Sequence, residues 1–239
     1  GGGITGAGIA LDAATRGLKT VLIERNDFAF GTSSRSTKLI HGGLRYLKQL
    51  EFALVKEVGS ERAIVHNLVP HLVVPEKMLL PLYERRGLGY WLASVGLMIY
   101  DWLAGVKPED QRRMLTKPQT LRHEPLLKAD DIKGGALYAE YRTDDARLTI
   151  EIAKEAHAKG ALLINYLAVT DFRYENDQVQ GVKVRDMITG ATMSVRARSV
   201  VNAAGPWVDE LREINHSRKD KHLHLTKGVH VVVPYHRMP

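Results

Sequence analysis

The sequence predicts an α/β protein in which a Rossmann-like domain is interleaved with a second domain built on a mixed sheet. The first observation is the glycine-rich run over residues 1–6, which fits G-x-G-x-x-G and leads into an alanine-rich helical pattern. The second is a short apolar strand pattern over residues 20–23 that ends on Glu24, close to the spacing of a βαβ unit. The third is the order of the later elements, a helix, a meander and a strand entering a small-residue turn.

The glycine-rich run has the features of a dinucleotide phosphate site. Gly1, Gly3 and Gly6 let the backbone turn tightly and approach a pyrophosphate, and the N-terminus of the helix that extends to Arg16 favours anions. Glu24 is placed to accept hydrogen bonds from ribose hydroxyls. Because the later elements lack the regular alternation of a nicotinamide dehydrogenase, we expect the dinucleotide to be a flavin.

The next part of the chain alternates polar loops with apolar segments. The patterns predict a polar loop over 26–38, a helix from Leu44 to about Asn67, short strands over 72–83, a helix within 87–106, loops and short helices over 107–133, and a strand over 136–142.

A regular order of elements follows from Asp144. Asp144 or Thr143 is expected to cap a helix that ends at Gly160, and we interpret Asp144 and Asp145 as cap residues rather than ligands. Strands are then predicted over 169–174, 179–185, 192–196 and 199–201, with Pro206 opening a new helix and a last apolar strand before Pro239.

Both ends of the sequence lead us to expect a fragment of a longer protein. The strand that precedes the glycines of a Rossmann unit is missing, because residue 1 is already the first glycine. We expect a flavin-binding domain formed by residues 1–69 and 143–215, and a substrate domain formed by residues 70–142 and 216–239.

Composition narrows the range of partners. The 34 basic and 27 acidic residues give a net charge of +7, which favours anionic partners such as phosphorylated metabolites or acidic lipids. Nucleic acid is not expected, since the basic residues are scattered and no nucleic-acid-binding motif occurs. The absence of cysteine excludes disulfides and thiolate catalysis and suits a reducing compartment.

The stretch over residues 87–106 is unusually apolar and aromatic. Its one charge is Asp101, and Arg85, Arg86 and Lys107 flank it. A buried helix is the favoured interpretation, a helix lying in a membrane interface is the next, and a transmembrane span is the least favoured.

Five segments together point to one family. They are the opening glycine run, GTSSRSTKLIHGGLRYL at 31–47, YRTDDARL at 141–148, NAAGPW at 202–207 and KGVH at 227–230. In this order they resemble the FAD-dependent glycerol-3-phosphate dehydrogenases of the D-amino-acid-oxidase-like superfamily, over essentially the whole chain.

That resemblance implies oxidation of sn-glycerol 3-phosphate to dihydroxyacetone phosphate, with electrons passed from FAD to a membrane quinone. It further implies a cytoplasmic protein attached peripherally to the membrane, and a homodimer is compatible with it. A glycerol-3-phosphate oxidase that forms peroxide, and a non-catalytic flavin-binding fragment, stay open as alternatives. Further family motifs would lie beyond Pro239, so an isolated fragment of this kind can be inactive.

The resemblance also assigns site residues. The catalytic base would be His41 or His230, because a neutral imidazole suits removal of the substrate hydroxyl proton. The substrate phosphate would be bound by Arg45, Tyr46 and Lys227. The implied FAD-binding residues are Gly1, Gly3, Gly6, Glu24, Thr32, Ser33, Ser34, Lys38, Leu39, Val169, Ala204 and Gly205.

No metal site is expected. His222 and His224 lie two residues apart and would share one face of a strand, but the sequence offers no third ligand beside them.

Overall fold

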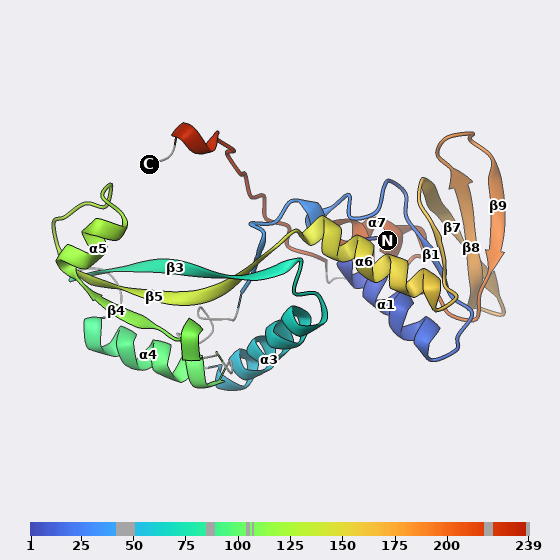
Figure 1. The fold of residues 1–239 in the computed structure, drawn as a ribbon. Coiled ribbons are helices and arrows are strands. Elements are labelled where there is room, and N and C mark those ends of the chain that lie inside the picture. Colours follow the sequence, from blue (N-terminus) through green and yellow to red (C-terminus); the bar gives the residue numbers. More distant parts are fainter. Residues whose placement is uncertain (42–50, 85–88, 104–105, 107, 218–221, 238–239) are drawn as a thin grey trace. The chain divides into compact units, whose positions relative to one another are not determined.

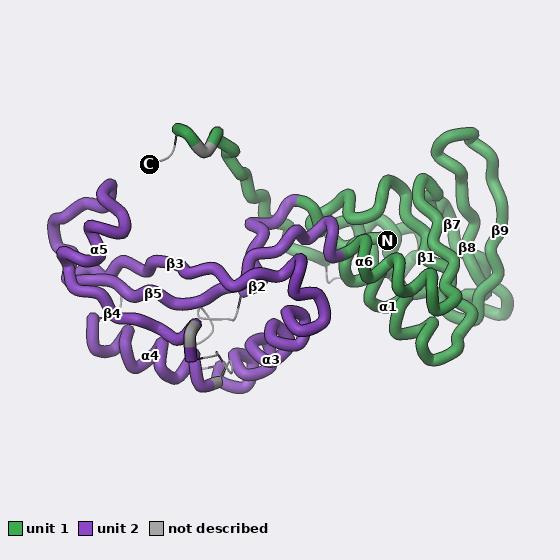
Figure 2. Tube along the Cα trace, viewed as in Figure 1, with its two compact units in different colours: residues 1–34, 149–239 green, residues 35–148 purple. Residues whose placement is uncertain are grey.

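The computed structural model of the chain describes all residues except 42–50, 85–88, 104–105, 107, 218–221 and 238–239. The chain forms two compact units (Figure 2). Unit 1 comprises residues 1–34 and 149–239, and unit 2 comprises residues 35–148. The assignment of these segments to a flavin-binding and a substrate domain remains a prediction.

Unit 1 holds a parallel strand pair and an antiparallel meander (Figure 1). In the pair, Val21 of β1 lies opposite Leu162 of β6, and the meander has the order β7-β8-β9. The elements are α1 (Ile4–Thr15), β1 (Val21–Ile23), η1 (Thr32–Ser34), most of α6 (Asp145–Ala158, which enters unit 1 at Thr149), β6 (Leu162–Ile164), β7 (Leu167–Glu175), β8 (Gln178–Asp186), β9 (Thr192–Arg196), η3 (Gly205–Trp207), α7 (Val208–Ile214) and η4 (Tyr235–Arg237).

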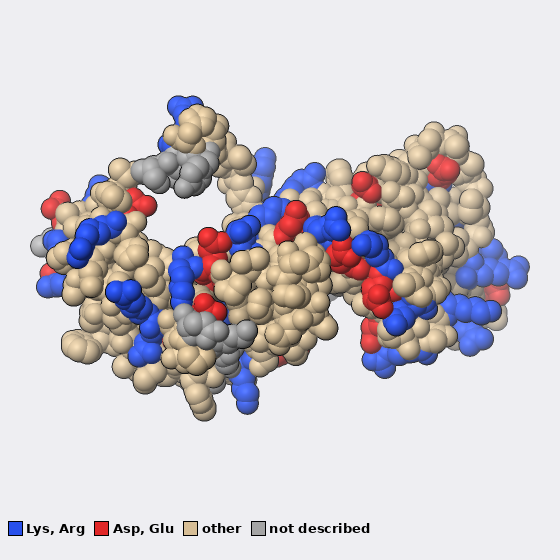
Figure 3. Space-filling model, viewed as in Figure 1, with Lys and Arg blue, Asp and Glu red and all other residues tan. Residues whose placement is uncertain are grey.

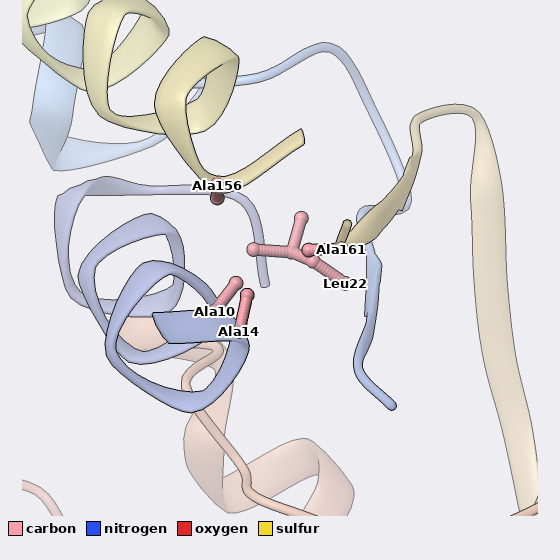
Figure 4. Close-up of a cluster of buried hydrophobic side chains, with 5 residues drawn as sticks. All are labelled: Ala10, Ala14, Leu22, Ala156 and Ala161. Carbon is pink, nitrogen blue, oxygen red and sulfur yellow. The ribbon is translucent and has the colours of Figure 1, made fainter. Parts of the chain in front are cut away.

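Small side chains form the core beneath the strand pair (Figure 4). Ala10 and Ala14 of α1 and Ala156 of α6 pack around Leu22 of β1, together with Ala161. Positions 10 and 14 are four residues apart and therefore share one face of α1. Alanine at these positions lets the helices approach the strand closely, which brings the N-terminus of α1 near the end of β1.

The meander has its own apolar core. Leu167, Phe172, Val182 and Val184 are buried, and Leu211 of α7 packs against them. The turns of the meander fall between the strands that the sequence predicts, with Asn176 and Asp177 at positive φ in the first turn.

Unit 2 is a sheet with long helices. The strand β5 pairs antiparallel with β3 on one side and with β2 and β4 on the other (Figure 1). The elements are β2 (Leu39–Ile40), α3 (Phe52–Leu68), β3 (Val73–Tyr83), α4 (Tyr90–Leu103), η2 (Pro108–Asp110), β4 (Arg113–Thr116), α5 (Lys117–His123) and β5 (Ile132–Thr143).

A buried ion pair joins α3 to this sheet. Arg62 and Glu140 are only 3% and 2% exposed, and Arg62 Nη1 lies 3.1 Å from Glu140 Oε2. Arg62 Nη1 also donates to the hydroxyl of Tyr100 in α4 at 2.7 Å, and its guanidinium lies 4.8 Å from the ring centre of Tyr141. Burial raises the pKa of Tyr100, so its hydroxyl stays protonated and can donate to Glu140 Oε1 at 3.3 Å.

The helix α4 has one buried and one exposed face. Leu97 and Tyr100 are buried, whereas Trp91 and Trp102 are 81% and 80% exposed. Among the described residues, no helix has the length and apolar character that crossing a membrane would require. Residues 90–103 of the aromatic stretch form a helix, as predicted, but the favoured interpretation of a buried helix holds for one of its faces only.

One boundary agrees with the sequence patterns and two elements differ. Asp144 caps α6, because its Oδ1 accepts the Arg147 N–H at 3.1 Å. The predicted short strands over 72–83 form one strand of 11 residues, β3, since β5 supplies a continuous partner. The helix predicted to follow the glycine run of residues 1–6 starts within that run, at Ile4, so Gly6 lies in its first turn. The predicted start at Leu44 lies outside the described residues.

Two predicted strands do not form. Residues 199–201 and the apolar run 229–233 have no regular structure, and neither segment has a ladder partner among the described residues. Val231 and Val232 are 84% and 91% exposed. A strand needs a neighbour to satisfy its backbone groups, so apolar composition was insufficient here.

Breaking the buried ion pair is expected to destabilise the protein strongly. Arg62→Met leaves the Glu140 carboxylate buried without its cation, so the free energy of unfolding in urea should fall by about 3–5 kcal/mol. The control is Lys133→Met, which removes the exposed partner of Glu84 and should cost less than about 1 kcal/mol. Equal small losses in both variants would contradict the importance of the buried pair.

Candidate dinucleotide-binding site

The N-terminus of α1 has backbone amides available for an anion. Gly3 is the N-cap residue and provides no side-chain cap. The Ile4 N–H donates to Ser33 Oγ at 2.9 Å, while the hydrogen bonds of the described residues leave the N–H groups of Thr5 and Gly6 without an acceptor. Free amides at the positive end of a helix dipole form an anion-binding site.

The glycine loop is too tight for side chains. A Cβ at Gly6 would lie 1.8 Å from the Gly1 carbonyl oxygen, and a Cβ at Gly1 would lie 2.3 Å from that of Ala203. Both distances are far below van der Waals contact. Glycine is therefore required for the backbone packing itself, in addition to any ligand.

Glu24 is held in place by backbone amides. Its Oε2 accepts the Gly2 N–H at 2.6 Å, and its Oε1 accepts the Asn26 N–H at 2.8 Å. A carboxylate has about four lone-pair sites, so both oxygens can still accept a hydroxyl proton. The carboxylate is thus oriented beside the glycine loop with acceptor capacity to spare.

The segment 30–34 lies beside α1. Ser33 contributes the hydroxyl that accepts the Ile4 N–H, and Ser34 Oγ donates to the Gly31 carbonyl at 3.3 Å. Thr32 begins η1 and is exposed. This segment thereby completes the cap of a helix whose own N-cap residue has no side chain.

The turn at residues 202–207 packs on the glycine loop. The Ala204 N–H donates to Asn202 Oδ1 at 3.2 Å, and Gly205 has a φ of +55°, in the left-handed region that favours glycine. Val169 lies in β7 opposite Val184 and packs at the edge of the meander core. The structure therefore brings Ala204 to the glycine loop, and it places Val169 in the neighbouring sheet.

Lys38 and Leu39 belong to unit 2. The Lys38 ammonium pairs with Asp145, and Leu39 lies in β2 opposite Arg142. Burial acts to raise the pKa of Asp145, but hydrogen bonds from Lys38 and Ser36 outweigh it, so this pKa lies below its usual value. The interaction stabilises the folded chain near neutral pH and is lost as the pH falls through the lowered pKa.

The predicted catalytic and substrate residues are divided between the two units. His41 directly follows β2 in unit 2, whereas Lys227 and His230 lie in unit 1 in a segment without regular structure. All three side chains are exposed. Arg45 and Tyr46 lie outside the described residues.

Three residues of this region were missed by the sequence reasoning. Ala203 closes over Gly1, and Trp207 packs on Gly31 with Arg25 over its ring. The motif NAAGPW contained two of them, but its spacing could not show which segment the indole would meet. In the described part of the chain, no group of three or more His, Cys, Asp or Glu side chains could hold a metal ion.

These features fit the ADP part of a flavin dinucleotide: a cradle that excludes Cβ atoms, free helix amides and an oriented carboxylate. A sequence model of the FAD dependent oxidoreductase family matches residues 1–239. The chain belongs to this family. Membership confirms the predicted fold class and the prediction of FAD over a nicotinamide cofactor.

The relatives are consistent with the resemblance stated above. The chain is 55% identical over 240 residues to the aerobic glycerol-3-phosphate dehydrogenase of Staphylococcus epidermidis, covering 100% of the chain and 43% of the relative. The enzyme of the same name from Staphylococcus aureus is 56% identical, with the same coverage. The chain thus spans less than half the length of these relatives.

Solved structures agree. The glycerol-3-phosphate dehydrogenase of Bacillus halodurans, determined with FAD, is 48% identical, with a TM-score of 0.70 over 90% of this chain and 35% of that one. The L-proline dehydrogenase of P. horikoshii has a TM-score of 0.66 over 90% of this chain and 54% of its own, but at 21% identity it shows the fold alone.

Adding one methyl group to the glycine loop is expected to abolish FAD retention. Gly6→Ala forces its Cβ against the Gly1 carbonyl and must displace the N-terminus of α1. Flavin absorbance of the purified variant should fall to under about a tenth of the wild-type value. Gly8→Ala is the control, since its Cβ would meet nothing within 4 Å. Full flavin content in Gly6→Ala would show that the loop tolerates a side chain.

Proposed function

We propose that the intact protein oxidises sn-glycerol 3-phosphate to dihydroxyacetone phosphate and passes the electrons to a membrane quinone. The observation that carries this proposal is 55% identity, over the whole chain, to an aerobic glycerol-3-phosphate dehydrogenase. When bound, FAD supplies the hydride acceptor for this oxidation. A cytoplasmic location and a homodimeric state belong to the same proposal.

In this proposal unit 1 binds the ADP part of the cofactor. The amides at the start of α1 and the loop of Gly1, Gly3 and Gly6 hold the pyrophosphate, and Glu24 accepts the ribose hydroxyls. The other proposed FAD contacts are Thr32, Ser33, Ser34, Lys38, Leu39, the backbone of Val169, Ala204 and Gly205. Support comes from the free amides, the oriented carboxylate and the absence of space for Cβ atoms in the loop.

A histidine removes the substrate hydroxyl proton. His41 and His230 are the candidates, because His41 directly precedes Gly42, His230 lies two residues after Gly228, and both side chains are exposed, where solvent can exchange protons with the ring. The substrate phosphate needs a fixed cation, and we assign this role to Arg45, with Tyr46 and Lys227 as further donors. By the same reasoning residues 70–142 and 216–239 contribute the substrate domain.

The activity is tested by anaerobic single-turnover reduction of the flavin. Adding glycerol 3-phosphate should bleach the flavin absorbance, and replacing the catalytic histidine by Asn should slow this about a hundredfold to ten-thousandfold. His41→Asn and His230→Asn are compared, with exposed His71→Asn as the control. Wild-type rates in both variants across pH would exclude these histidines.

The same reduced enzyme identifies the electron acceptor. Fast reoxidation by a soluble quinone with little peroxide in air supports the dehydrogenase, whereas stoichiometric peroxide supports an oxidase. If glycerol 3-phosphate does not reduce the bound flavin, only a flavin-binding role remains.

Peripheral membrane attachment through α4 is part of the proposal. Trp91, Val95, Met98 and Trp102 follow helical spacing and are 81%, 47%, 48% and 80% exposed. An amphipathic helix with tryptophans on its apolar face suits the headgroup region of a bilayer. Figure 3 shows Lys and Arg side chains over the part of unit 2 that contains β4, α4 and α5, which favours anionic lipid.

Replacing both tryptophans is expected to weaken binding to anionic vesicles. Trp91→Ser with Trp102→Ser removes two large exposed apolar side chains, so the apparent affinity in a sedimentation assay should fall about tenfold or more. The control is Leu68→Ser, which removes an apolar side chain that is 74% exposed on α3. If the double variant binds vesicles normally, the basic surface elsewhere carries the attachment.

A further inference from the structure

Trp207 packs directly on the backbone of a distant segment of unit 1. A Cβ at Gly31 would lie 2.9 Å from Cζ3 of the indole, so glycine leaves room for the ring at this position. The ring centre of Phe30 lies 6.4 Å from that of Trp207. On the indole, Arg25 places its guanidinium 5.7 Å from the ring centre and pairs with Glu210 of α7 at 3.3 Å.

The indole thereby joins two of the segments proposed to contact FAD. One is residues 31–34, in which Ser33 accepts the Ile4 N–H at the start of α1. The other is the turn of Ala204 and Gly205, which directly precedes Trp207 in the chain. The Ser33 hydroxyl oxygen accepts the Ile4 N–H. Its own O–H can therefore still donate to a phosphate oxygen.

We propose that Trp207 is a positioning residue for the pyrophosphate of FAD, acting through Ser33. Its indole holds the segment 31–34 against the turn at 204–205 and so fixes the Ser33 hydroxyl at the N-terminus of α1. Arg25 covers the ring and, through Glu210, ties it to α7. This inference rests on the FAD contacts proposed above. It adds Trp207, which is not one of those contacts.

The alternative is that Trp207 only packs the protein. The two roles differ in what they do to the free protein and to binding. A packing residue lowers the thermal stability of the protein without FAD, whereas a positioning residue raises the dissociation constant for FAD at a temperature where the free protein is folded.

The test is a double-mutant cycle between Trp207→Leu and Ser33→Ala, with FAD titrated into the apoprotein and followed by flavin fluorescence. Each single change should raise the dissociation constant about tenfold, and the double variant should be little worse than either, because both changes remove the same contact. ADP, which carries the pyrophosphate without the flavin ring, should show the same pattern. Trp102→Leu, at an exposed tryptophan of unit 2, should leave binding unchanged.

A second variant probes the same contact from the other side. Gly31→Ala pushes a methyl group into the indole and should weaken FAD binding about tenfold alone, but add little in the Trp207→Leu background, where the ring is gone. If Trp207→Leu fails to fold, Gly31→Ala and Trp207→Phe, each compared with the wild type, test the positioning role instead.

Wild-type affinity in the Trp207 variants, or independent and additive effects of Trp207→Leu and Ser33→Ala, would overturn the inference. Wild-type protein that binds no FAD would instead overturn the proposed function.

Discussion

Backbone packed against backbone, with no side chain between, is the constraint on which the dinucleotide-binding region depends. Gly6 lies over the carbonyl of Gly1, and Gly1 in turn lies against Ala203. This contact fixes the start of α1 relative to β1. Glu24, directly after β1, strengthens the arrangement by accepting a hydrogen bond from the Gly2 N–H. The free amides, the carboxylate and the turn after residue 203 are therefore set by a single close approach.

The two units are stabilised in different ways. In unit 1, alanines on α1 and α6 surround Leu22, so small side chains let helices and strands approach closely. In unit 2, the buried pair of Arg62 and Glu140 joins α3 to β5, and the hydroxyl of Tyr100 brings in α4. Such a pair stabilises only while both partners are present, so it specifies which surfaces meet as much as it adds stability.

Local patterns were sufficient where the structure is local. The helix cap at Asp144 and the turn at Asn176 and Asp177 depend on neighbouring residues, and the family follows from motifs in order. Patterns failed where a distant partner decides the structure. The apolar run at 229–233 resembles a strand but has no partner among the described residues, and no spacing could show that Ser33 would cap α1. The roles of the predicted histidines stay predictions.

The helix α6 belongs to both units. Its first turn, with Asp145 held by Lys38 and Ser36, falls in unit 2, and the helix from Thr149 onward falls in unit 1. Expressing the units separately, with a break between residues 148 and 149, would therefore cut a helix instead of a linker. The second piece would begin without the Asp144 cap, a loss of about 1 kcal/mol for that helix. Unit 1 is also discontinuous in sequence, so no single segment encodes it, and its two parts must find each other during folding across more than a hundred intervening residues, 35–148.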